Sequence, residues 1–135
     1  MTERKPYHVR IKRAYADPSR DDGRRVLVDR LWPRGMARDR LALDDWLKEA
    51  APSNDLRRWF NHDPARWLEF VARYRDELKR QPASEAVAEL VRCARQGPLT
   101  LVYAARDETY NDAVALRDLI AQHLLHGKGR KARAS

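Results

Sequence analysis

The chain has 135 residues, of which 43% are hydrophobic, and its formal net charge is +8 at neutral pH. This length favours one domain with a core of its own. No apolar run reaches the roughly 18 residues that a membrane-spanning helix needs, and the charged N-terminus lacks the apolar segment of a secretory signal. The single cysteine, Cys93, cannot form an internal disulfide. A reducing cytoplasm is therefore the expected location.

The positive charge is unevenly distributed along the chain. Residues 127–135 contain four basic side chains and no acidic one, so removing these four from the 28 basic residues leaves 24 against 20 acidic residues. A Gly/Ala/Lys/Arg composition of this kind favours disorder. We predict a single domain over residues 1–126 and a disordered basic tail over 127–135. Such a tail either improves solubility or binds nucleic acid.

The first half of the chain predicts two strands. Apolar and basic residues alternate over 8–14, which is typical of a half-buried strand. The segment 16–24 contains the turn signals Asp-Pro and Asp-Gly. A second strand is expected over about 25–31, whose apolar residues are Val26, Leu27, Val28 and Leu31. It ends at the Pro-Arg-Gly turn of 33–35, and most of 36–52 is expected to be loop.

Three helical regions follow. Ser53 can cap a short helix, and Asp63-Pro64 is typical of the start of the next one. Apolar residues repeat at helical spacing from Trp67 to Leu78, which predicts one buried face. Ser84 is the expected N-cap of another helix, which Gly97 ends.

The last third predicts a strand and a helix. The segment 98–104 (PLTLVYA) is almost continuously apolar, as suits the centre of a sheet. Thr109 and Asp112 resemble a capping box that opens a helix to about Leu125. The order strand, strand, helices, strand, helix predicts a single compact α/β domain, with a small, at least partly parallel sheet flanked by helices.

A first candidate cluster follows the second predicted strand. It combines a carboxylate, two guanidinium groups and an indole in Asp29, Arg30, Trp32 and Arg34. Arginine binds phosphate or carboxylate through a rigid fork, and tryptophan stacks on bases, sugars or cations. The alternative is that Asp29 forms a structural ion pair and Trp32 fills the core.

A second candidate cluster follows the last predicted strand. Arg106 precedes a helix start, where free backbone N–H groups favour anions, and Asn111 could orient a polar ligand. The segment lacks the glycine-rich loop of nucleotide-binding fingerprints, so ordinary helix capping is the alternative. Tyr103 either points into the same pocket or belongs to the core.

A third cluster lies between two predicted helices and contains Trp59 and His62. The reference pKa of histidine, about 6.5, makes His62 the best general acid–base candidate, with Asp29 as the second. A local hydrogen bond that stabilises the turn is the alternative role of His62. His123 and His126 have no further ligands at metal-binding spacing, so neither a metal nor a cofactor is expected.

Three segments taken together resemble a known family. They are DRLWPRG at 29–35, the segment 51–78 that begins APSNDLRRWF, and LTLVYAARDETYNDAVAL at 99–116. They are similar to the bacterial YeaO-like proteins of the family named domain of unknown function 488. The resemblance covers roughly residues 9–120 and implies a small cytoplasmic α/β protein without an established reaction. It directs attention to Asp29, Arg30, Trp32, Pro33, Arg34, Gly35, Trp59, His62, Asp63, Pro64, Tyr74, Tyr103 and Asn111.

The chain also departs from the pattern of this family. More distant members carry a cysteine in the last strand and a Cys-His-Arg group at the start of the following helix. This chain has Tyr103 and the run Tyr110-Asn111-Asp112 in those regions. The resemblance therefore does not imply thiol chemistry or a metal site here.

Because ligands of parallel sheets bind beyond the carboxyl ends of the strands, we predict a pocket between 32–35 and 106–111, with His62 on its rim. Its ligand would be an anionic small molecule, such as a nucleotide or another phosphate- or carboxylate-bearing compound. In an enzyme, Arg34 and Arg106 would stabilise negative charge. One alternative is a nucleic-acid-binding module that uses the basic surface and tail. Another is a structural or interaction protein with the Arg/Trp cluster as its partner surface.

Overall fold

The computed structural model describes residues 7–134 of the chain, with the side chains of residues 7–126. Four strands form one sheet in the order β1-β4-β2-β3, and every neighbouring pair is parallel. The strands are β1 (Val9–Arg13), β2 (Arg24–Leu27), β3 (Asp45–Trp46) and β4 (Leu99–Tyr103). The predicted α/β fold class is confirmed.

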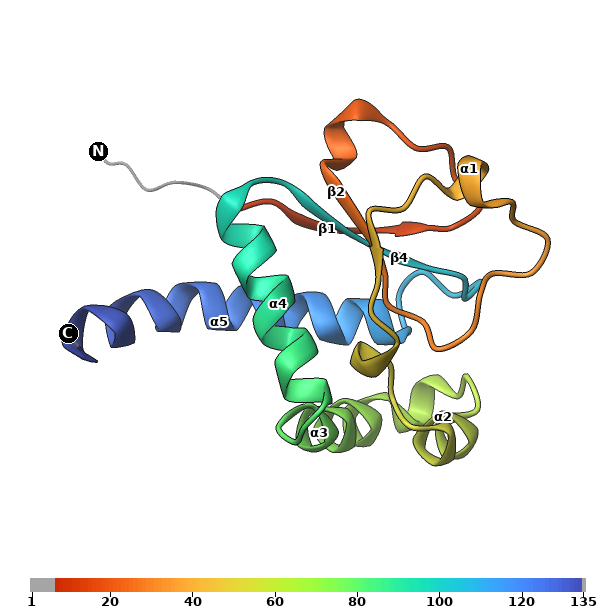
Figure 1. Cartoon of the computed structure of the whole chain (residues 1–135). Helices are drawn as coiled ribbons and strands as arrows, with labels where there is room; N and C mark the ends of the chain where they lie inside the picture. The colour runs from red at the N-terminus through yellow and green to blue at the C-terminus, as the bar shows by residue number, and fades with distance from the viewer. Residues whose placement is uncertain (1–6, 135) are drawn as a thin grey trace.

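Helices connect and flank these strands (Figure 1). The α-helices are α1 (Arg38–Leu41), α2 (Asn54–Phe60), α3 (Trp67–Leu78), α4 (Ala83–Gln96) and α5 (Asp112–Ala134). Three short 3-10 turns accompany them, namely η1 (Arg20–Asp22), η2 (Lys48–Ala50) and η3 (Pro64–Arg66). None of the helices within residues 7–134 combines the length and apolar character needed to cross a membrane.

Strand β4 is central, as its sequence predicts, and all five of its residues are buried. Successive side chains of a strand point to opposite faces. Leu101 and Tyr103 therefore join the main core, whereas Val102 joins a smaller core on the other face. Burial on both faces explains why the strand has no polar alternation.

The two faces of the sheet are covered differently. Helices α2 to α5 contribute to the main core, where the rings of Phe60 and Phe70 stack with centroids 4.4 Å apart. On the other face, Leu41 and the partly buried Trp32 and Trp46 pack against the sheet. The segment that contains them runs between β2 and β3.

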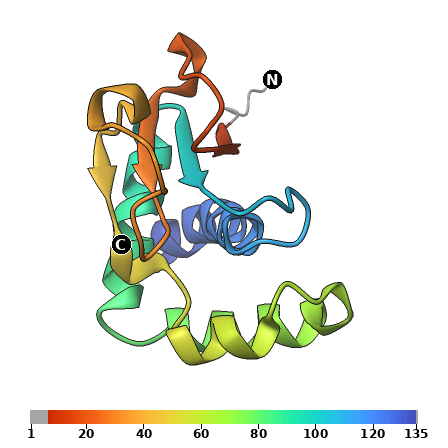
Figure 2. The ribbon, with the colours of Figure 1, turned by 90° about the vertical axis from the view of Figure 1, so that its right-hand side faces the viewer.

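The carboxyl ends of the strands face helix α2. In Figure 2 the arrowheads of β2, β3 and β4 point toward the layer formed by α2 and α3. Ser53 caps α2 by accepting a hydrogen bond from the Leu56 N–H at 3.1 Å. Asp63 caps η3, which leads into α3, by accepting from the Ala65 N–H at 3.0 Å. Both predicted caps are confirmed, and they place the α2–α3 turn opposite the strand ends.

Several local predictions are wrong in detail. Strand β2 ends at Leu27 instead of Leu31, and the Leu31 side chain is 67% exposed because the chain has left the sheet. The cap of α4 is Pro82, one residue before the helix, and not Ser84. The region predicted as loop contains α1 and β3. These differences arise where tertiary contacts decide the backbone conformation.

The backbone of α5 is helical from Asp112 to Ala134, so the helix continues past the predicted end near Leu125. The side chains of residues 127–135, the predicted basic tail, lie outside the described residues. The boundary of the domain at residue 126 and the disorder of this tail in solution therefore stay predictions.

Candidate functional site

Two adjoining cavities open beyond the carboxyl ends of the strands. One has a volume of about 260 Å³ and the other about 380 Å³. The same four residues, Arg57, His62, Ala105 and Asp112, line both of them. We call the combined depression around these four residues the strand-end pocket. It lies where parallel sheets usually bind ligands.

Asp29 enters this pocket directly after β2. The Val28 N–H still donates to the Val102 carbonyl at 3.1 Å, so the chain follows β4 up to this point. One carboxylate oxygen of Asp29 then accepts a hydrogen bond from the Ala104 N–H at 2.9 Å. The carboxylate thus continues the pairing of the two central strands and stays half-buried at the pocket wall.

Asp112 reaches the pocket from the first turn of α5. The cap of this helix is Asn111, whose side-chain oxygen accepts from the Val114 N–H at 3.0 Å. The amide nitrogen of Asn111 donates to the Asp107 carbonyl at 2.8 Å. Asn111 is therefore committed to holding the helix start, and the following carboxyl group of Asp112 lines both cavities.

The two carboxyl groups influence each other's protonation. Burial, together with the nearby charge of Asp29, raises the pKa of Asp112 to about 8. Burial also raises the pKa of Asp29, against the opposing effects of the Ala104 N–H, the Arg57 charge and a hydrogen bond with the Asp112 carboxyl group. Because two close carboxylates resist double ionisation, we expect this pair to retain a proton near neutral pH.

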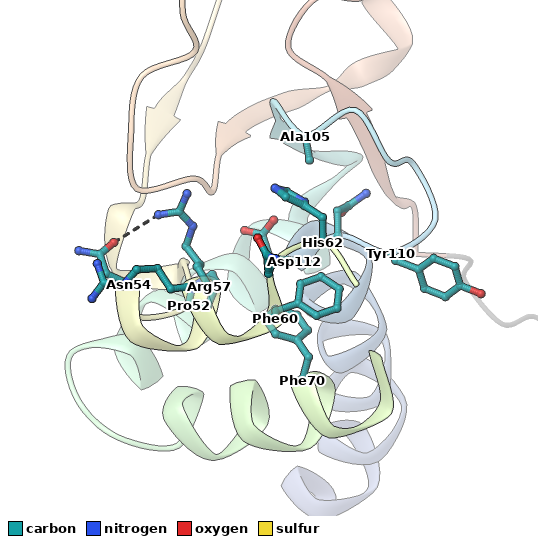
Figure 3. A pocket seen from close by; sticks show the side chains of 12 residues that line it. Pro52, Asn54, Arg57, Phe60, His62, Phe70, Ala105, Tyr110 and Asp112 are labelled. Atoms are coloured by element: carbon teal, nitrogen blue, oxygen red, sulfur yellow. Dashed lines mark hydrogen bonds between the residues drawn. The ribbon is translucent and has the colours of Figure 1, made fainter. Parts of the chain in front are cut away.

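Arg57 and His62 form the α2 side of the pocket (Figure 3). An Nη atom of Arg57 donates to the side-chain oxygen of Asn54 at 3.3 Å. Asn61 and His62 both have positive φ, 48° and 54°, which turns the chain sharply between α2 and η3. This turn places the exposed imidazole against both cavities.

Aromatic rings form the apolar side of the first cavity. Phe60 and Phe70 line it with their stacked rings, and Figure 3 shows the two rings below Asp112. The pocket therefore combines apolar contact with groups of both charges.

Six of the residues predicted from the sequence line the pocket, namely Asp29, Arg30, Trp32, Arg34, His62 and Asn111. Arg30 and Trp32, like Asp29 and Asn111, also make hydrogen bonds that hold the local structure. Arg30 donates to the carbonyls of Ala51 and Pro52 at 3.3 and 3.4 Å. Trp32 donates through its indole nitrogen to the Met36 carbonyl at 2.7 Å, so part of its role is to shape the loop.

Three predicted residues do not line the pocket. The ring of Trp59 makes cation–π contacts with the guanidinium groups of Arg66 and Arg73, whose central carbons lie 5.2 and 4.5 Å from its centroid. Tyr103 is 2% exposed and belongs to the main core. Arg106 is exposed outside both cavities. The expected partnership of Arg34 with Arg106 across the pocket is therefore not present.

Sequence reasoning missed Arg57 and Asp112. In the sequence, Arg57 is one of two adjacent arginines expected on the surface of a short helix. Asp112 is part of a predicted capping box. No local pattern separates them from ordinary surface and capping residues. The predicted topology contained the signal that could have identified a site residue here. A helix start that follows a central parallel strand lies at the ligand-binding edge of the sheet.

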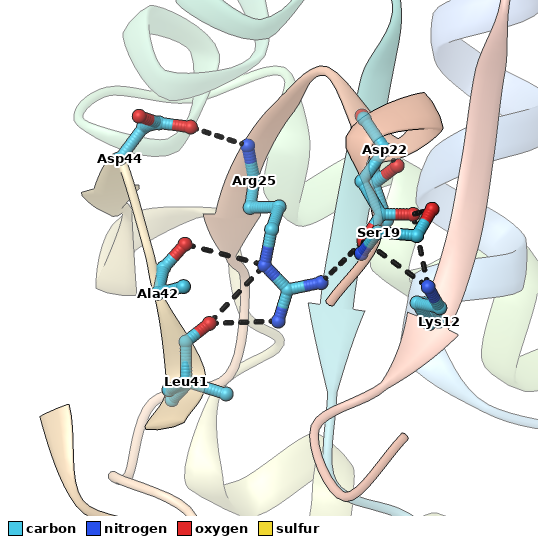
Figure 4. A network of polar contacts seen from close by, with 8 residues as sticks. Lys12, Ser19, Asp22, Arg25, Leu41, Ala42 and Asp44 are labelled. Atoms are coloured by element: carbon cyan, nitrogen blue, oxygen red, sulfur yellow. Dashed lines mark hydrogen bonds and ion pairs between the residues drawn. The ribbon is translucent and has the colours of Figure 1, made fainter. Parts of the chain in front are cut away.

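A second polar cluster lies on the other face of the sheet (Figure 4). The Asp22 carboxylate contacts Lys12 Nζ at 3.0 Å and a guanidinium nitrogen of Arg25 at 2.8 Å. The other arm of Arg25 donates to the Leu41 carbonyl at 2.7 Å. Burial alone would raise the pKa of Asp22, but hydrogen bonds from Ser19, Lys12 and Arg25 outweigh it and lower the pKa. With its partners supplied by the fold, this cluster is structural.

Among the side chains of residues 7–126, no group of three or more His, Cys, Asp or Glu residues is placed to hold a metal ion.

Comparison with known proteins identifies the family. The family described as the inactive DUF488-N3 subclade matches residues 8–135. The chain belongs to this DUF488 family. Its DUF488 relatives include the uncharacterized protein YeaO of Escherichia coli, which is 40% identical over 112 residues covering 82% of this chain and 95% of YeaO. The resemblance inferred from sequence is confirmed.

Other relatives of this DUF488 protein occur in mycobacteria. Uncharacterized proteins of Mycobacterium tuberculosis and Mycobacterium bovis are each 42% identical over 112 residues, covering 83% of this chain and 92% of the relative. No solved structure matches the chain.

Asp22→Asn should destabilise the protein by about 3 kcal/mol at pH 7, because it leaves Lys12 and Arg25 without a counter-charge. Urea unfolding measures this change. Asp21→Asn, in the exposed neighbour, is the matched control and should change the free energy of unfolding by less than about 0.5 kcal/mol. Equal effects of the two substitutions would contradict a structural role for the Asp22 cluster.

Asp112→Asn should remove a pH dependence of stability. The pKa of Asp112 is raised from 3.8 in the reference state to about 8 in the folded protein. The folded state therefore binds this proton more tightly, and its stabilising contribution is lost as pH rises through that window. Between pH 5 and pH 9 the wild type should lose up to about 4 kcal/mol more than the variant, the effect of the three pH units between 5 and the folded pKa of about 8.

Urea unfolding at both pH values tests this expectation, with Asp118→Asn on the exposed side of α5 as the control. An unchanged pH dependence in Asp112→Asn would show that Asp112 does not carry the excess proton.

Proposed function

We propose that the protein is a ligand-binding domain whose strand-end pocket takes an anionic small molecule. The observation that carries this proposal is the position of Arg57. Its side chain lines both cavities, and the ion pairs within residues 7–126 join other residues. The Arg57 guanidinium group is near enough to Asp29 and Asp112 to lower their pKa values, but it is in ion-pair contact with neither. Its N–H groups can therefore still bind a phosphate or carboxylate.

Further groups support anion binding at the same place. Arg34 lines the larger cavity and His62 lines both. A protonated Asp112 carboxyl would be a hydrogen-bond donor instead of a second negative charge. The stacked rings of Phe60 and Phe70 offer an apolar surface to the non-polar part of a ligand.

The description of the family favours a protein that binds its ligand without converting it. The matching family carries the description "inactive". The family resemblance places cysteines of distant members in the regions where this chain has Tyr103 and the run Tyr110-Asn111-Asp112. Tyr103 packs in the core and Asn111 caps α5. His62 and Asp29 would then orient a ligand. Assays for hydrolysis or transfer of bound phosphate esters test whether these two residues also take part in proton transfer.

Arg57→Ala should weaken binding of anionic ligands about 10-fold to 100-fold, as expected for loss of a charged hydrogen bond. The measurement is the thermal shift produced by inorganic phosphate, short dicarboxylates and mononucleotides. Arg80→Ala, which removes one exposed charge outside the pocket, is the control. If a ligand stabilises the wild type and Arg57→Ala equally, the pocket is not its binding site.

The concentration of positive charge in the final nine residues supports nucleic-acid binding as a second candidate function. Deleting residues 127–135 removes four of the 28 basic residues. If the tail contacts phosphates, the deletion should lower the slope of log affinity against log salt for duplex DNA by about 3 to 4. Binding of a pocket ligand should stay unchanged. An equal salt slope in the two proteins would exclude this use of the tail.

A further inference from the structure

The strand-end pocket contains negative groups that a simple anion site does not need. Asp29 and Asp112 approach it from two different elements, the end of β2 and the start of α5, and both line the larger cavity. Neither takes part in an ion pair with a described residue. The next cation in the chain, Arg30, directs its Nη2 to backbone carbonyls.

This arrangement leaves two partly buried carboxyl groups without a cation in contact. Buried carboxylates are ordinarily paired or neutralised. The Asp22 carboxylate on the other face of the sheet follows that rule, with contacts to Lys12 and Arg25. Asp29 and Asp112 have no such cation in contact among the described residues. They are hydrogen-bonded to each other, Arg57 acts on both only through its charge, and both line a cavity.

A ligand can supply that partner. We propose that the ligand carries a protonated amine, or another N–H donor group, beside its anionic group, with the donor bound by Asp29 and Asp112 and the anionic group by Arg57. This inference rests on the proposed function and adds the second half of the ligand. Phe60 and Phe70 would contact the hydrocarbon or planar part that joins the two ends, because their rings line the cavity that also contains Arg57 and Asp112.

The arrangement selects between classes of anions. A ligand with only a phosphate or carboxylate gains at Arg57 and meets the negative charge of the carboxyl pair. A ligand with both groups gains at both ends, since the amine replaces the water or proton that otherwise satisfies the pair. The preference for the amine should therefore depend on the aspartates, and the affinity for the anion on Arg57.

Matched probes separate these two contributions. The first pair is O-phosphoethanolamine and ethyl phosphate, and the second, one carbon longer, is 3-aminopropyl phosphate and propyl phosphate. Each pair differs by the amine alone. Affinities are measured by NMR titration of the full-length protein at pH 8, and we expect one of the amines to bind at least about tenfold more tightly than its partner.

Variants then assign the preference to residues. The double substitution Asp29→Asn with Asp112→Asn should abolish the amine preference while retaining binding of the alkyl phosphate. Arg57→Ala should weaken both members of a pair. Asp118→Asn, on the exposed side of α5, is the control and should leave the preference unchanged. Thermal unfolding and amide spectra establish that each variant is folded, and the single Asp112→Asn variant replaces the double one if that is unfolded.

The outcomes distinguish the inference from the proposed function. Equal affinity for both members of each pair, with loss of both in Arg57→Ala, would overturn the inference and leave the anion site intact. An amine preference that survives in the asparagine variants would also overturn it. Binding unaffected by Arg57→Ala, or no binding of any probe up to about 10 mM, would overturn both.

Discussion

The hydrogen bond between the Asp29 carboxylate and the Ala104 N–H, 2.9 Å long, is the contact on which the geometry of the pocket depends. It extends the pairing of β2 and β4 past the end of the sheet. The backbone carbonyl of Asp29 accepts a second bond, from the Trp46 indole at 2.7 Å, so the same residue is also tied to β3. One residue thus joins the ends of three strands. Because the chain leaves β4 at Ala104, this contact also directs the segment that leads to Asp112.

The protein contains two kinds of partly or fully buried aspartate, and their surroundings shift their pKa values in opposite directions. Asp22 lies between Lys12 and Arg25, and its pKa is lowered. Asp112 lies beside the Asp29 carboxyl group, and burial together with the charge of Asp29 raises its pKa. A carboxylate whose partners come from the fold stabilises the fold. A carboxyl group that lines a cavity is accessible to a ligand. We therefore interpret the first cluster as structural and propose a binding role for the second.

The accuracy of the sequence predictions follows the range of the interactions involved. The caps at Ser53 and Asp63 and the stop at Gly97 depend on neighbouring residues, and each was predictable from the local sequence. Leu31 looked buried because its apolar neighbours continue a strand pattern, yet β2 ends earlier and the side chain is exposed. The position of the pocket, at the carboxyl ends of the parallel strands, was predictable from the sequence. The contribution of Arg57 was not predictable, because it depends on how α2 docks below those ends.

The sequence by itself determined the α/β class, the central position of β4, the caps of α2 and η3, and the loops from which a site could be built. These features follow from local hydrogen bonding and from the periodic burial of side chains, both of which are written in neighbouring residues. Only the tertiary structure decided that Asp29, Asp112, Arg57 and His62 share one pocket, while Trp59, Tyr103 and Arg106 lie elsewhere. The reason is that these four side chains come from distant parts of the chain, and only the packing of α2 and α5 against the strand ends brings them together.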